Sequence, residues 1–333
     1  MGGVYESICD SSFSGVGKEE GQCGDMADYA VGSIIRDARE RQKYSQEELS
    51  FGICTASTLS RIENGVQAPG KKILEALMQR LGIVDRIYNS YLTPEELERY
   101  ETEERLTRCL AQKDYGQAEK LVDMLEKKFA GISKKEYSLK LEEQYVCFAR
   151  VLICKNQGEC AESVLEQLME VIRMTIPDFD GIHIRARLLT FHEISILNNI
   201  GCAYHAAGNV CGALRLLFEL KEYIEEHVFG GQELSVKYLM ILQNLSSWLG
   251  QEGQHREALE LCQKGIDYCI EYGKLHTFPM LLCNKACALA ELGRNDVSKD
   301  NFYQSVAVFQ AMGQRERAEQ VRKYAENRYG IKV

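Results

Sequence analysis

Residues 45–65 decide the fold of this 333-residue chain, and they read Ser45-Gln-Glu-Glu-Leu-Ser-Phe-Gly-Ile-Cys-Thr-Ala-Ser-Thr-Leu-Ser-Arg-Ile-Glu-Asn-Gly65. Ser45 is a good N-cap, and Glu48 three residues later completes a capping box, so the pattern predicts a helix that begins here. Gly52 ends that helix, and Thr55 can cap a second one. Two short capped helices joined by such a turn predict a helix-turn-helix, whose second helix fits the major groove of DNA.

The faces of the second helix separate core from surface. Leu59 and Ile62, three residues apart, share one apolar face and should be buried. Ala56, Ser57 and Arg61 fall on other faces, where solvent or a partner can reach them. The pattern therefore predicts a helix that packs through one side and presents the other to DNA.

A longer pattern surrounds this stretch at consistent spacing. It consists of Gly32-x-x-Ile35-Arg36-x-x-Arg39, Ser45-Gln46-x-x-Leu49, Leu59-Ser60-Arg61-Ile62-Glu63-Asn64-Gly65, Pro69 and Leu81-Gly82-Ile83. Over these roughly 55 residues the chain resembles the bacterial helix-turn-helix family typified by phage repressors and Cro. The Gly-Ile-Cys run before the second helix resembles the variant found in Rgg- and PlcR-type regulators, which are quorum-sensing proteins of Gram-positive bacteria.

The resemblance implies which side chains contact DNA. Base-reading positions of the recognition helix are occupied by Ala56, Ser57 and Arg61. Arg61 suits a bidentate contact with guanine, whereas Ala56 is long enough only for a thymine methyl. Phosphate-contacting positions, which fix register rather than sequence, are occupied by Ser45, Gln46, Asn64 and Lys71. Arg39 and Glu63 match a pair that ties the first helix to the end of the third, so we expect a structural role for them.

Charge separates the two ends of the chain. Residues 29–90 contain nine Lys or Arg and seven Asp or Glu, a net charge of +2, whereas the whole chain carries −9 and the rest therefore −11. The DNA-binding end is thus the only part that phosphates would not repel. Because +2 gives a monomer only modest affinity for DNA, we expect a dimer that reads two half-sites.

Amino-acid composition and helix-start signals predict an all-α protein and the boundaries of its domains. Hydrophobic residues make up 45% of the chain, which contains only four prolines, and strand-like alternation is hard to find. Residues 1–28 read as a flexible leader, and residues 29–90 as a five-helix repressor-like domain whose last helix is expected at 83–88. Thr93-Pro94-Glu95-Glu96 is typical of a helix start, so we place a second domain at 91–333.

The second domain repeats itself. The three clearest copies are Asn199-Ile-Gly201-x-x-Tyr204-x-x-x-Gly208-x-x-x-x-Ala213, Asn244-Leu-Ser-Ser-x-Leu249-x-x-x-Gly253-x-x-x-x-Ala258 and Asn284-Lys-Ala286-x-x-Leu289-x-x-x-Gly293-x-x-x-x-Ser298. This pattern resembles the tetratricopeptide repeat, a pair of helices of about 34 residues. The resemblance implies a right-handed superhelix of five or six helix pairs with the last helices as a cap, and a concave groove lined by the first helix of each pair.

The repeated asparagines suggest a peptide site in that groove. Asn199, Asn244 and Asn284 would form a ladder of amides, which can both donate to and accept from an extended peptide backbone. Neighbouring positions on the same helices add further candidates, namely Asn198, Gln243 and His205. The alternative is that the asparagines bond the neighbouring helix. Their recurrence at a fixed register favours the peptide, since polar side chains are expensive inside such helices without partners.

Enzymatic and metal sites are not expected. The six histidines include no pair one helical turn apart, and the chain has no phosphate loop, nucleophile elbow or Cys-x-x-Cys motif. We therefore predict no catalytic residue, metal or cofactor. The 13 cysteines read as reduced core residues, with Cys54 the one whose oxidation could affect DNA binding. No apolar run reaches the 18 residues needed to cross a bilayer, and no secretory signal is evident, so we expect a cytoplasmic protein.

Together the two domains resemble the Rgg/PlcR class of peptide-responsive transcriptional regulators. The resemblance implies a cytoplasmic homodimer that binds double-stranded promoter DNA and a short imported signalling peptide. Two alternatives stay open: a protein-interaction scaffold that the first domain merely tethers, and a regulator of the same architecture that senses no peptide.

Overall fold

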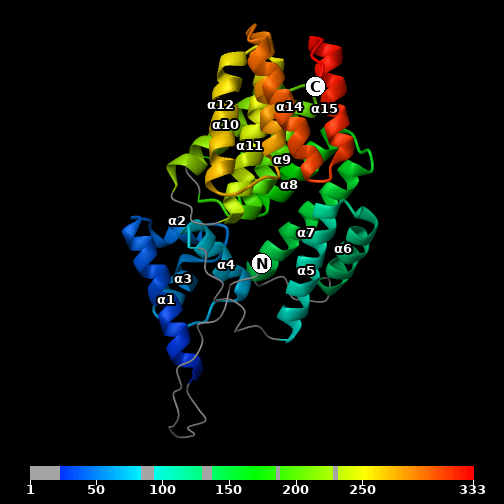
Figure 1. Cartoon of the computed structure of the whole chain (residues 1–333). Helices are drawn as coiled ribbons and strands as arrows, with labels where there is room; N and C mark the ends of the chain where they lie inside the picture. The colour runs from blue at the N-terminus through cyan, green and yellow to red at the C-terminus, as the bar shows by residue number, and fades with distance from the viewer. Residues whose placement is uncertain (1–22, 84–93, 130–136, 185–187, 228–231) are drawn as a thin grey trace, which may run out of the picture.

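The computed structural model describes residues 23–83, 94–129, 137–184, 188–227 and 232–333, and within these ranges every regular element is a helix (Figure 1). The N-terminal domain contains α1 (Cys23–Arg41), α2 (Gln46–Ser50), α3 (Ala56–Glu63) and α4 (Lys71–Arg80). The expected fifth helix at 83–88 lies almost wholly outside the described residues. Helix α1 begins at Cys23, which lies inside the 1–28 segment that the sequence analysis expected to be a flexible leader.

The helix caps of the N-terminal domain lie where the sequence predicts them. Ser45 caps α2 by accepting a hydrogen bond from the backbone of Glu48, whose carboxylate accepts one from the Ser45 N–H, and Thr55 caps α3. The core lies between the four helices and includes Ile35, Leu49, Leu59 and Leu77. Each of these helices thus buries one apolar face, as their spacing requires.

The C-terminal domain is a stack of helices. These are α5 (Pro94–Gln112), α6 (Tyr115–Phe129), α7 (Tyr137–Asn156), α8 (Ala161–Arg173), α9 (Phe191–Ala206), α10 (Val210–Glu226), α11 (Gln232–Gln251), α12 (His255–Glu271), α13 (Phe278–Glu291), α14 (Asn295–Ala311) and α15 (Arg315–Tyr329). Successive helices pack against each other, and α11 also contacts α9 and α13. The first helices of the pairs therefore lie side by side, as in a tetratricopeptide superhelix, with α15 as the last (Figure 1).

Glycines make the turns inside the repeated pairs. Gly208, Gly253 and Gly293 follow α9, α11 and α13 and have φ values of 80°, 76° and 74°, a left-handed conformation that other residues adopt only with strain. This explains the fixed distance from asparagine to glycine in the sequence: the asparagine lies mid-helix, and the glycine ends the turn.

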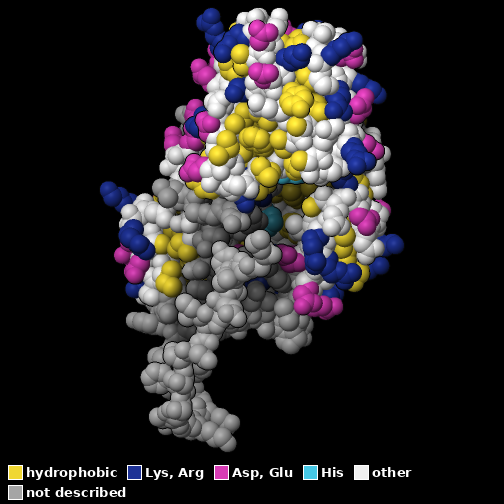
Figure 2. All heavy atoms as spheres, viewed as in Figure 1, with side chains coloured by type: hydrophobic (Ala, Val, Ile, Leu, Met, Phe, Trp, Pro, Cys, Tyr) yellow, Lys and Arg dark blue, Asp and Glu magenta, His cyan; other side chains and the backbone are white. Residues whose placement is uncertain are grey.

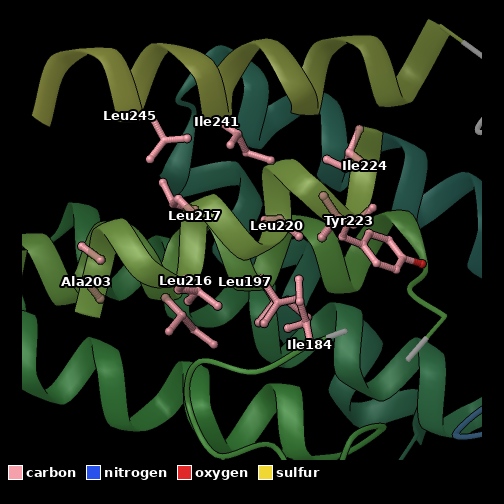
Figure 3. Packing of buried hydrophobic residues seen from close by; sticks show 14 of the residues in the cluster. Ile184, Leu197, Ala203, Leu216, Leu217, Leu220, Tyr223, Ile224, Ile241 and Leu245 are labelled. Carbon is pink, nitrogen blue, oxygen red and sulfur yellow. The ribbon is translucent and has the colours of Figure 1, made fainter. Parts of the chain in front are cut away.

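The largest core runs through the middle of the stack. Leu197 on α9, Leu216 and Leu220 on α10, and Ile241 on α11 are fully buried in this core, between the three helices (Figure 3). Burial of this kind contributes about 1.5–3 kcal/mol for each large aliphatic side chain. None of the described helices is both long and apolar enough to cross a membrane.

The two domains share a packed boundary. Leu188, in the segment before α9, belongs to the core of the N-terminal domain, and Leu141 of α7 packs on the same core. Gly52 has a φ of 71°, and a Cβ atom there would lie 2.4 Å from the carbonyl oxygen of Thr175, which follows α8. The close approach therefore requires a glycine in the turn before the recognition helix.

Polar contacts join α4 to the start of α9. The Arg80 guanidinium lies 3.6 Å from the Glu193 carboxylate, and the side chain of each is only 1% exposed. Arg80 also donates to the Leu49 carbonyl oxygen at 3.0 Å, and the Phe191 N–H donates to the Gln79 side chain at 3.0 Å. Helix α9 is thus fastened at its first turn to the end of the helix-turn-helix domain.

Candidate DNA-binding surface and ligand groove

The recognition helix α3 presents the face that its sequence predicts. Leu59 and Ile62 are 0% and 1% exposed in the core, whereas Ser57 and Arg61 lie on the exposed side. Ala56 is partly covered at the first turn. The Thr55 and Ser57 hydroxyls are 2.9 Å apart, so Ser57 is held at the helix start, where it can still reach a groove of DNA. Arg61 is one turn further along the same surface.

A bidentate ion pair fixes the orientation of this helix. Arg39 on α1 donates from Nε and Nη2 to the two carboxylate oxygens of Glu63, at 2.6 and 2.9 Å. Because Glu63 is buried, this pair ties α1 to the end of α3, and the expected structural role of Arg39 and Glu63 is confirmed. Gln46 also donates to Glu63, at 2.7 Å, so its side-chain amide is engaged inside the domain.

The four expected phosphate contacts differ in accessibility. Ser45 is exposed at the start of α2, where its hydroxyl accepts from the Glu48 N–H at 3.1 Å. Asn64 is exposed, but its amide donates to the Ser60 carbonyl oxygen at 2.7 Å and accepts from Arg36. Lys71 has a side chain only 7% exposed, 3.8 Å from a Glu75 carboxylate oxygen, and burial lowers its pKa. Its enclosure argues against a phosphate contact by Lys71.

The cysteine beside the recognition helix is shielded. Cys54 is 6% exposed, and burial raises the pKa of its thiol to about 11. Because oxidation requires an accessible thiolate, this burial argues against an effect of Cys54 oxidation on DNA binding.

A cavity of about 1040 Å³ opens between the first helices at the C-terminal end of the stack. Its walls come from α11 between Met240 and Gln251, from α13 between Met280 and Glu291, and from α15 between Arg317 and Tyr329. We call this cavity the groove. Its volume lies at or above the upper end of the range typical of small-ligand pockets, and three helices contribute most of its lining.

The predicted amide positions divide into two groups. Gln243, Asn244 and Asn284 line the groove. Asn198, Asn199 and His205, all on α9, do not. Asn199 donates to the Ser195 carbonyl oxygen of its own helix at 2.9 Å, and His205 stacks on Trp248 with ring centroids 4.5 Å apart.

Hydrogen bonds explain what the recurrent asparagines do in the ligand-free chain. The Asn284 amide donates to the Gln243 carbonyl oxygen at 3.1 Å and to the Ser246 hydroxyl at 3.0 Å. The Asn244 amide donates to Asn198 Oδ1 at 3.2 Å. Each N–H₂ group therefore reaches back to the preceding first helix, which is the alternative that the sequence left open. The amide oxygens of Asn244 and Asn284 accept no hydrogen bond from the described residues, so they stay candidates for binding a ligand in the groove.

The repeats did not predict the wall supplied by α15. This helix carries Arg317, Tyr324 and Arg328 into the groove but lacks the asparagine of the other first helices. Within the described residues, no group of three or more His, Cys, Asp or Glu side chains is arranged to hold a metal ion.

Comparisons with known proteins agree with this geometry. Residues 35–88 match the family model described as helix-turn-helix. The structure of Bacillus thuringiensis PlcR in complex with the peptide PapR7 and DNA is similar, with 18% identity, a TM-score of 0.56, and coverage of 88% of this chain and 99% of that one.

The apo form of the same Bacillus thuringiensis protein is similar as well, at 16% identity and a TM-score of 0.53, covering 88% of this chain and 98% of that one. No curated protein matches the sequence significantly. The chain thus joins a helix-turn-helix domain to a stack of tetratricopeptide-like helix pairs, in the fold that PlcR also has.

Proposed function

We propose that this chain is a transcriptional regulator that binds promoter DNA through α3 and is gated by a short signalling peptide bound in the groove. The observation that carries the proposal is the pairing of a helix-turn-helix domain with an open groove in one fold. PlcR has the same fold, and one of its solved structures is a complex with both a peptide and DNA. Neither role requires catalysis, so we propose no enzymatic activity.

DNA binding would use a small surface. Ser57 and Arg61 are exposed for the bases, and the α2 N-terminus with Ser45 is exposed for a phosphate. With a net charge of only +2 for residues 29–90, one copy would bind DNA weakly. A cytoplasmic homodimer that spans two half-sites would supply the missing affinity.

Helix α9 offers a connection between the two sites. Glu193 in its first turn pairs with Arg80 of the DNA-binding domain, and Asn198 further along accepts from Asn244 on the groove wall. A peptide that binds two arrangements of α11 unequally would therefore change the placement of α9 and of the domain attached to it. In a dimer this changes the spacing of the two recognition helices.

Fluorescence anisotropy on labelled DNA tests the first half of the proposal. Fragments of the region upstream of the protein's own gene are compared with random DNA of the same length at fixed salt. Tighter binding to an upstream fragment supports a regulator, whereas equal affinities at every salt concentration favour the scaffold. Mass spectrometry of small molecules retained after incubation in spent culture medium tests the second half, and retention of no peptide favours a regulator that senses none.

A further inference from the structure

The charge of the groove differs from that of the domain around it. Residues 91–333 contain 30 Lys or Arg and 36 Asp or Glu, so the domain is acidic, and side chains of both signs are interspersed over the face of the stack in Figure 2. The groove lining instead contains two arginines, Arg317 and Arg328, against one carboxylate, Glu291. His255 and His276 also line it, and neither carries a negative charge. A low-dielectric cleft with an excess of one charge attracts a ligand of the opposite charge.

The two arginines differ in whether they form an ion pair. Arg328 donates to Glu291 at 3.3 Å and is thereby neutralised. Arg317 makes no ion pair within the described part of the chain. Its hydrogen bond and its ring contact there are both with neutral groups, the Gln314 side-chain oxygen at 3.3 Å and the Phe309 ring, whose centroid lies 5.9 Å from its guanidinium carbon. Arg317 is partly buried at the groove wall, so its charge is held in place without a protein counter-charge.

The amides of the groove specify a second feature of the ligand. The N–H₂ groups of Asn244 and Asn284 are used within the protein, and their oxygens are left to accept. A ligand that pairs with both oxygens must supply N–H donors from two points along its length. An extended peptide backbone does this, whereas a small carboxylic acid does not.

We infer that the groove takes an acidic peptide, whose carboxylate binds the guanidinium of Arg317 while backbone N–H groups donate to Asn244 and Asn284. Met240, Met280 and Val321 supply apolar lining for its other side chains. The carboxylate is a side chain of the peptide or its C-terminus, since both present the same two oxygens to a guanidinium. This inference rests on the proposed function, because it assumes a peptide in the groove, and it adds the charge of that peptide and the residue that selects it.

Three pools of labelled peptides test the inference on the full chain. All are random heptapeptides of Gly, Leu, Ile, Val and Phe that carry a dansyl group, which is uncharged at neutral pH, at the N-terminus. The first has one Glu at a varied position and an amidated C-terminus, the second has Gln in place of Glu and a free C-terminus, and the third has Gln and an amidated C-terminus. The amount of each pool that elutes with the protein in gel filtration is measured by fluorescence.

The wild-type chain should retain one of the two carboxylate pools about tenfold better than the neutral pool, the ratio expected for one charge-assisted pair. Arg317→Gln should reduce that ratio to about one and still retain the neutral pool. The control is Arg315→Gln, which removes an exposed arginine of the same helix outside the groove and should leave the ratio unchanged. Thermal unfolding of both variants shows that they are folded.

Every other outcome contradicts one identifiable part of the inference. Equal retention of all three pools by the wild-type chain would overturn the acidic-peptide inference and leave a peptide groove. A ratio that survives in Arg317→Gln, or that also disappears in Arg315→Gln, would overturn the role of Arg317. Retention of no pool would overturn the proposed peptide function together with the inference.

Discussion

Arg80 and Glu193 face each other at 3.6 Å across the boundary between the DNA-binding domain and the helical stack, each with a side chain only 1% exposed. The pair is not a surface contact that forms and breaks at little cost. Arg80 also donates to two carbonyl oxygens of the helix-turn-helix, and Glu193 accepts from the backbone N–H of Thr190, the N-cap of α9, at 2.7 Å. This ion pair therefore joins the last residue of α4, in the DNA-binding domain, to the first turn of α9, the helix that contacts the groove wall.

Breaking this pair should destabilise the chain strongly. Glu193→Gln or Arg80→Met leaves one buried charge without its partner, and we expect a loss of about 3–5 kcal/mol in the free energy of unfolding. Urea denaturation measures the loss. Arg328→Gln, which removes an exposed and solvent-screened ion pair with Glu291, should change the free energy of unfolding far less. The double replacement of Arg80 and Glu193 should cost less than the sum of the single ones, and strict additivity would show that the charges do not interact.

DNA binding should depend on Arg61 of α3 and not on Lys71 of α4. Arg61→Ala removes an exposed base-reading candidate, so specific DNA binding should weaken by about 1–3 kcal/mol while binding to random DNA changes less. Lys71→Ala removes a lysine that is enclosed beside Glu75, so affinity and its salt dependence should change little. Both are measured by anisotropy over a salt series. A salt slope that falls by about one in Lys71→Ala would restore the phosphate contact that the sequence suggested.

The groove asparagines should contribute to both stability and binding. Asn284→Ala removes two hydrogen bonds to α11, and we expect a loss of about 1–2 kcal/mol in the free energy of unfolding. It should also weaken retention of peptides, because an acceptor oxygen is lost from the groove. Asn199→Ala is the matched control: Asn199 bonds only its own helix and lies outside the groove, so peptide retention should not change. Equal weakening by both variants would place the peptide elsewhere on the concave side.

One histidine should make the fold sensitive to acid. His192 on α9 packs against Tyr145, with ring centroids 5.0 Å apart, and burial lowers its pKa to about 3. In the unfolded chain its pKa is about 6.5, so below that pH the unfolded state binds the proton first. The free energy of unfolding should therefore fall as pH decreases from 6.5 toward 3, by at most about 1.4 kcal/mol per unit from this group. His192→Phe should flatten the curve between pH 6.5 and 5, and an unchanged slope would assign the acid sensitivity to other groups.

The cysteines should divide by accessibility when the native chain is alkylated. Cys160 and Cys211 are exposed, whereas Cys54 is 6% exposed with a pKa raised to about 11. Iodoacetamide followed by mass spectrometry should label Cys160 and Cys211 and leave Cys54 unmodified until the chain unfolds. Rapid labelling of Cys54 in the native state would show that the turn before α3 opens.

Local signals explain how much of this fold could be predicted. The capping box at Ser45 and Glu48, the cap at Thr55 and the buried pair Leu59 and Ile62 depend on residues a few positions apart, and each lies where the sequence predicted. The recurring asparagines marked the first helices of the repeats correctly, because the glycine that ends each turn keeps a fixed distance from them. The all-α, two-part architecture followed from these patterns.

Contacts between distant residues could not be predicted in the same way. Nothing local couples Gln79 to Phe191, which are 112 positions apart, or indicates that Arg80 and Glu193 would meet. The third groove wall was missed because α15 lacks the repeated asparagine. The assignments of Ser45, Gln46, Ser57, Arg61 and the groove amides remain predictions, since they concern partners that bind from outside.

The central claim is that a peptide changes the affinity of this chain for its promoter. The most direct measurement is the dissociation constant for an upstream DNA fragment, determined by anisotropy at fixed salt with and without the peptide-containing fraction of spent culture medium. A ligand-gated regulator predicts a shift of about five-fold or more, in either direction, that disappears when the fraction is treated with a protease. Specific binding with an identical constant in both conditions would contradict the claim.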